Sequence, residues 1–119
     1  MDEITTLLEK YNHFKYEQIR SIDQLPDSSK VVTLVVQDED GEDTNTVKIE
    51  FTNIKDSKIL VDSVLSYLDM TSGISIINEN NLYGFAIGHG DAMLHVHNAP
   101  LYIISSDIKI ISDITAEGK

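Results

Sequence analysis

The sequence predicts an α+β domain in which an antiparallel sheet, strongly curved or sandwich-like, carries one or two helices on one face. Three observations lead to this fold. Short runs of β-branched residues recur, turn-forming Gly, Pro and Asn separate them, and two segments have apolar residues at helical spacing. The links between runs are too short for parallel crossovers. The 119 residues are expected to form a single domain, 1–119.

The chain is expected to begin with a helix over residues 2–12. Four apolar residues recur there at helical spacing, namely Ile4, Leu7, Leu8 and Tyr11. A weak strand over residues 16–22 follows. Residues 25–29 then form a loop, because Pro26 and small polar residues interrupt strand pairing.

The next segment predicts a β-hairpin. Residues 31–36 are apolar on both faces and suit a central strand. The acidic segment 38–43 forms the turn, since Asp40-Gly41 supplies the positive φ angles of tight hairpins. The return strand 46–51 alternates, so that one face carries three core candidates: Val47, Ile49 and Phe51.

Residues 57–70 predict a second helix. Their apolar residues lie at helical spacing, Asp56 or Ser57 is positioned to cap the start, and Gly73 is positioned to end it. Asp62 and Asp69 would share its exposed face. A strand is the alternative for this segment, because it is rich in β-branched residues.

The C-terminal third predicts five further strands. They are separated by turn-forming residues at 80–81, 88–90 and 98–100. The expected strands cover residues 74–77, 82–87, 93–97, 101–104 and 108–111.

Charge and composition narrow the classes of function. Twenty Asp and Glu face nine Lys and Arg, which gives a net charge of −11. This balance disfavours nucleic acid and favours basic surfaces. The absence of Cys excludes disulfides and thiol chemistry. The first residues lack the features of a signal peptide, and no apolar run is long enough to cross a membrane, so the cytoplasm is the expected location.

The acidic side chains are the candidate partner-binding residues. Segment 38–43 is not a calcium loop, since Ile49 stands where such a loop has its Glu. The alternative is a hairpin tip that serves only solubility. The candidates are Asp38, Glu39, Asp40, Glu42 and Asp43 in the hairpin, with Asp62 and Asp69 in the second helix.

A histidine cluster supports a different reading. On a strand over residues 93–97, His95 and His97 would point to the same face, and His89 and Asp91 lie in the preceding turn. These residues would suit zinc or iron in a small metal-dependent enzyme or metal-binding barrel. The pair resembles the first metal motif of cupins, but the spacing to Gly88 and Gly90 differs and the following acid is missing. No metal or cofactor is therefore expected.

Two stretches resemble immunity proteins of bacterial polymorphic toxin systems. Residues 12–22, Asn-His-Phe-Lys-Tyr-Glu-Gln-Ile-Arg-Ser-Ile, are similar to a Phe-His-Asp-Ser-x-Ile opening, although His13 precedes Phe14 and no Asp follows. Residues 47–54, Val-Lys-Ile-Glu-Phe-Thr-Asn-Ile, resemble a strand that ends in a Phe-x-Asn-Val turn. The resemblance implies a binder that neutralises a toxin, and it carries over no functional residue.

Together these observations predict a non-catalytic acidic binding protein of the cytoplasm, most specifically an immunity-type inhibitor of a basic protein toxin. The expected partner is a basic protein, with neither nucleic acid nor membrane involved. The metal-dependent enzyme that uses His89, Asp91, His95 and His97 is one alternative. A structural or oligomerising module is the other.

Overall fold

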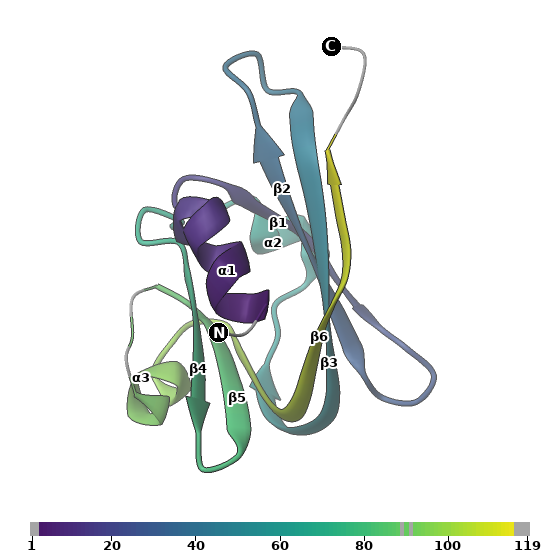
Figure 1. The fold of residues 1–119 in the computed structure, drawn as a ribbon, viewed down its shortest axis with the longest axis vertical. Coiled ribbons are helices and arrows are strands. Elements are labelled where there is room, and N and C mark those ends of the chain that lie inside the picture. The colour runs from purple at the N-terminus through teal and green to yellow at the C-terminus, as the bar shows by residue number, and fades with distance from the viewer. Residues whose placement is uncertain (1–2, 89, 91, 116–119) are drawn as a thin grey trace.

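The protein is built on one six-stranded sheet in the order β1-β2-β3-β6-β5-β4, with every neighbouring pair antiparallel (Figure 1). The computed structural model describes residues 3–88, 90 and 92–115. The predicted α+β class with an antiparallel sheet is confirmed. The strands are β1 Gln18–Gln24, β2 Lys30–Gln37, β3 Asp43–Lys58, β4 Ile74–Glu79, β5 Leu82–Ile87 and β6 Tyr102–Thr115.

The helices in the described part of the chain are short. They are α1 Glu3–Lys10, the 3-10 helix η1 Asn12–Phe14, α2 Asp62–Leu65 and α3 Met93–His97. The predicted N-terminal helix corresponds to α1, whose Leu7 and Leu8 are buried. None of these helices reaches the length and apolarity that a membrane span requires.

Two long strands form the centre of the sheet. β3 pairs with β6 from Asn45 opposite Thr115 to Lys58 opposite Tyr102, with register shifts on the way. The two strands predicted at 101–104 and 108–111 are therefore one continuous strand. The polar residues between them do not break it, because Ser105 and Asp107 pair with Ile54 and Thr52 of β3.

The main core lies on the face of the sheet that α1 covers (Figure 1). The predicted core residues of the return strand, Val47, Ile49 and Phe51, are all fully buried. The Phe51 ring packs against Phe85 with centroids 5.4 Å apart. Alternation in the sequence thus identified the inward face of β3 correctly.

The predicted helix over residues 57–70 is wrong. β3 continues through Lys58, where it pairs with β6, and the helix is reduced to the four residues of α2. Pairing with a long neighbouring strand outweighs the local helical spacing. Of the apolar residues that suggested the helix, Leu65 enters the core, while Val61 and Val64 are exposed. Gly73 precedes β4 and ends no helix.

The strand predicted at 93–97 is also wrong, because these residues form α3. This helix packs on β5 through a separate small cluster of Ala86, Val96, Ala99 and Ile104. Gly84 explains why the helix fits, since a Cβ there would lie only 2.7 Å from the sulfur of Met93. The missing side chain on β5 creates the space that α3 fills, and such a long-range cause is invisible in local periodicity.

Candidate partner-binding surface

The hairpin between β2 and β3 is closed by its own first acid. The Asp38 Oδ1 atom accepts hydrogen bonds from the backbone N–H groups of Asp40, at 2.9 Å, and Glu42, at 3.0 Å. Gly41 adopts a φ of 81°, which suits glycine. Asp38 therefore fixes the loop, and Glu39 and Asp40 are left on its exposed surface. The predicted hairpin is confirmed, but only one of the two residues expected to supply positive φ angles does so. The turn closes with the Gly41 backbone N–H donating to the Asp38 carbonyl, which leaves Gly41 alone in the left-handed region and Asp40 outside it.

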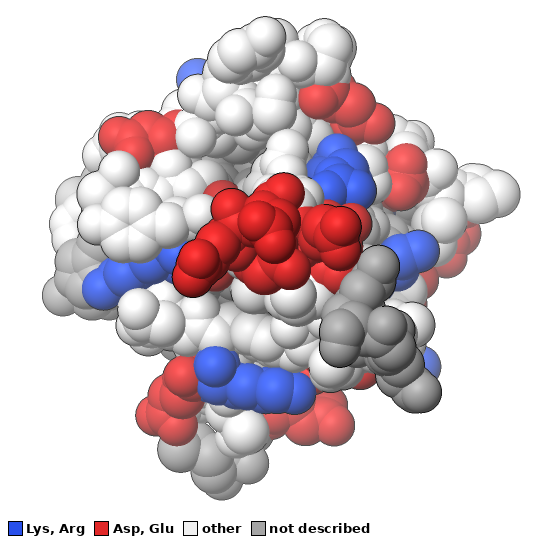
Figure 2. All heavy atoms as spheres, turned by 90° about the horizontal axis from the view of Figure 1, so that it is seen from above, with Lys and Arg blue, Asp and Glu red and all other residues white. Residues whose placement is uncertain are grey.

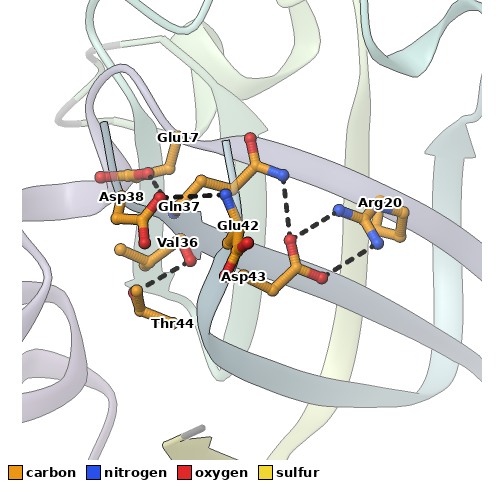
Figure 3. Close-up of polar contacts among 8 residues, drawn as sticks. All are labelled: Glu17, Arg20, Val36, Gln37, Asp38, Glu42, Asp43 and Thr44. Atoms are coloured by element: carbon orange, nitrogen blue, oxygen red, sulfur yellow. Dashed lines mark hydrogen bonds and ion pairs between the residues drawn. The ribbon is translucent and has the colours of Figure 1, made fainter. Parts of the chain in front are cut away.

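Asp43 has a different role at the base of the hairpin. Its two carboxylate oxygens accept hydrogen bonds from the Arg20 guanidinium at 3.0 and 3.2 Å, and Gln37 Nε2 donates to Oδ1 at 2.9 Å (Figure 3). The hydrogen bonds from Gln37 and Arg20 hold the pKa of Asp43 below its usual value. Asp43 thus ties β1 to the hairpin, and Arg20 offsets its charge.

One acid of this surface was missed in the sequence. Glu17 immediately precedes β1, and its Oε1 atom accepts a hydrogen bond from the Gln37 backbone N–H at 3.3 Å. Its side chain lies beside that of Asp38 (Figure 3). The register of β1 on β2, with Gln18 opposite Val35, places Glu17 next to the hairpin. This register depends on pairing between separate segments, so no local sequence pattern indicated the position of Glu17.

The acidic side chains of the β2–β3 hairpin lie at one end of the molecule. Figure 2 looks onto the end that carries the β2–β3 hairpin and shows acidic side chains clustered at its centre. Glu39 and Asp40 form no ion pair with any cation among the described residues. The end of the hairpin therefore presents uncompensated negative charge to solvent.

A groove of about 260 Å³ lies beside the hairpin. Its wall across from the hairpin comes from α2 and the turn that follows it. The backbone N–H of Tyr16 donates to the carbonyl of Met70 at 2.7 Å, which holds that turn against the start of β1. The groove is lined by Tyr16, Glu17, Gln18, Gln37, Asp38, Leu65, Ser66, Leu68 and Met70.

The two remaining predicted site residues flank this wall. Asp62 begins α2, and its Oδ1 atom accepts a hydrogen bond from the Ile22 backbone N–H at 3.4 Å. Asp69 lies beyond the helix and accepts hydrogen bonds from the Thr71 hydroxyl and N–H, which lower its pKa. The prediction that Asp62 and Asp69 share a helix face is wrong, because the predicted helix over residues 57–70 is not formed.

Several exposed apolar and aromatic side chains belong to residue 16 or to the α2 segment, both of which contribute to this groove. Tyr16 is 77% exposed and Tyr67 is 84% exposed, and Val61 and Val64 of the α2 segment are also exposed. Tyr16 lines the groove, and Tyr67 lies between the groove residues Ser66 and Leu68. Tyrosines of this kind are common anchors in protein interfaces. Local patterns in the sequence gave no reason to place Tyr16 beside the acidic hairpin.

The histidine cluster does not have its expected geometry. On α3, His95 and His97 are separated by about 200° around the helix axis rather than sharing one face. The Nδ1 atom of His97 lies 3.7 Å from the Asp56 carboxylate, and its ring packs edge-on against Tyr102. His89 and Asp91 lie outside the described residues. Among the described residues, no group of three or more acidic or histidine side chains is placed to hold a metal.

No protein-family model, curated protein or solved structure matches the chain.

Proposed function

We propose that this chain is a non-catalytic binding protein whose acidic hairpin end recognises a basic protein. The observation that carries the proposal is the combination at one end of the molecule. A hairpin braced by Asp38 and Asp43 presents Glu39 and Asp40 to solvent, and a groove lined by the exposed Tyr16 lies beside it. Charge supplies long-range attraction, and Tyr16 supplies contact area after docking.

The rigidity of the hairpin supports binding over mere solubility. A tip that serves only solubility needs charge, but it needs no fixed shape. Here the Asp38 carboxylate, the Arg20–Asp43 pair and the Gln37 side chain all order the loop. A preordered surface loses less conformational entropy on binding.

In its most specific form, the proposal is an immunity-type inhibitor of a basic protein toxin, acting in the cytoplasm of a bacterium. The net charge of −11 and the resemblance of residues 12–22 and 47–54 to such proteins support it. An acidic inhibitor gains association rate on a basic target through electrostatic steering. A gene for a large toxin beside the gene for this chain would agree with this form, whereas a metabolic enzyme would favour the alternative.

Affinity capture from the native cell tests the proposal. The immobilised protein should retain a basic protein in low salt and release it as salt rises. Adding the purified chain should then abolish the activity of that protein at equal molar amounts. Capture of an acidic partner would contradict the proposal. Capture of a basic partner whose activity the chain leaves intact would contradict its toxin form.

A further inference from the structure

We propose that the groove beside the hairpin receives one long cationic side chain, lysine or arginine, from the basic partner. This inference rests on the proposed function and deepens it, because it names the chemical group that the site selects. The groove has a mainly polar lining in which three apolar residues stand beside an acidic rim.

The floor and wall suit an alkyl stem. Leu65 and Met70 line the groove but are nearly fully buried, so an incoming stem would contact mainly the half-buried Leu68. The volume of about 260 Å³ lies below the range of about 300–1,000 Å³ typical of small-molecule pockets. Long cationic side chains pack their methylene stems on apolar surfaces of this kind and keep the charged group at the rim.

The rim suits the charged group. Glu17 and Asp38 both line the groove and lie side by side (Figure 3). Within the described residues, each uses one carboxylate oxygen for backbone N–H groups, Oε1 in Glu17 and Oδ1 in Asp38. The second oxygen of each is left to accept from an incoming cation. The exposed ring of Tyr16 at the same rim offers a further cation–π contact.

The occupant is identified by charge complementarity. A neutral apolar side chain would satisfy the floor but would leave two carboxylates unpaired at the rim, and an anion would be repelled by them. A cation satisfies both parts of the groove. The strongly negative net charge of the chain adds to this preference.

NMR titration of the isotope-labelled chain tests the inference directly. The probes are Nα-acetyl-lysine N-methylamide, its arginine counterpart and its norleucine counterpart, which keeps the stem but lacks the charge. The cationic probes should shift the amide signals of Tyr16, Glu17 and Leu68 in a saturable way. The norleucine probe should bind more weakly, by about two- to fivefold or more. Equal shifts from all three probes, or shifts confined to the hairpin tip, would overturn the inference.

Variants separate the groove from the general charge. Glu17→Gln keeps the acceptor for Gln37 and should weaken the cationic probes by about two- to fivefold. Glu39→Gln/Asp40→Asn should leave their binding at the groove nearly unchanged at physiological salt. If binding of the cationic probes is unchanged by Glu17→Gln but weakened by the tip variant, the shifts come from diffuse attraction. That result would overturn the inference.

A second pair of variants uses the captured partner. Ser66→Lys places a cation on the groove wall and should weaken binding of the partner. Ser63→Lys is the control, because it makes the same charge change on α2 away from the groove lining. Both residues are exposed, so both variants should fold. Equal affinities of the two variants would overturn the groove as an anchor and leave the hairpin-based function standing. Failure of the native chain to bind a basic partner would instead overturn the proposed function.

Discussion

Phe51 is the side chain on which the main core depends most directly. It is fully buried on β3 and packs against Phe85 of β5 in the same core cluster. We expect Phe51→Ala to lower the free energy of unfolding by about 3–5 kcal/mol, through lost burial and the cavity left behind. The exposed Tyr67 is the control, since Tyr67→Ala should change the free energy of unfolding by no more than about 0.5 kcal/mol. Urea denaturation measures both, and similar small losses would show that the inward face of β3 is misassigned.

Asp113 is an acid whose titration should affect stability. Burial raises its pKa, but hydrogen bonds from the Tyr11 hydroxyl, at 2.6 Å, and the Lys10 ammonium, at 2.9 Å, outweigh burial and lower it. A carboxylate whose pKa is lowered by folding stabilises the folded state at pH values above its unfolded-state pKa of about 3.9. This stabilisation is lost as the pH falls through the lower pKa of the folded state.

We therefore expect Asp113→Asn to cost about 1 kcal/mol of unfolding free energy near pH 7, a figure reduced for the exposure of the Lys10 partner. The difference between the variant and the native chain should shrink as the pH falls from about 5 to about 3. Chemical denaturation at several pH values measures it. A difference that stays constant over this range would show that the contact is not charge-dependent.

Two glycines in the left-handed region make a matched pair at the level of the turns. Gly41 in the hairpin has a φ of 81° and open space around its Cβ position. Gly73 before β4 has a φ of 72°, but a Cβ there would overlap the carbonyl oxygen of His13. Gly41→Ala should cost about 1–2 kcal/mol from backbone conformation alone.

Gly73→Ala carries the same backbone cost and adds a clash with η1, so its total should be larger by at least about 1 kcal/mol. Thermal and urea unfolding of the two variants give the comparison. Equal costs would mean that the contact between η1 and the start of β4 yields freely and does not hold the two segments together.

The elements that could be predicted from sequence are those whose signal is local. Alternation identified the β2–β3 hairpin, and helical spacing identified α1. The segments 57–70 and 93–97 failed because their structure depends on distant partners. Pairing with β6 extends β3 through Lys58, and the space above Gly84 admits α3. The histidine pair lost its expected shared face for the same reason.

The candidate site could be predicted only in its charges. The hairpin acids are contiguous in sequence, so they stood out at once. The groove is assembled from residues 16–18, 37–38 and four residues of the segment after β3 (65, 66, 68 and 70), which only the complete fold brings together. Glu17 and Tyr16 carried no signal of their own in the sequence. Composition thus indicated the class of partner, whereas the place where that partner docks required the three-dimensional structure.

At the scale of the whole molecule, the position of the negative charge should matter more than its total. The hairpin end, and not the net charge in general, should govern the approach of a basic partner (Figure 2). The double variant Glu39→Gln/Asp40→Asn removes two charges from the tip. The control Glu3→Gln/Glu9→Gln removes the same number from exposed positions on α1. Neither change should disturb the fold, because exposed charges contribute little to stability.

The most direct test is the association rate constant of the captured basic partner, measured for the native chain and both variants at low and physiological salt. The native rate should fall as salt rises, and the hairpin variant should associate more slowly at low salt while its dissociation rate changes little. The α1 control should stay close to the native chain. An association rate that is indifferent to salt and equal in all three proteins would contradict the central claim that the acidic hairpin recognises the partner.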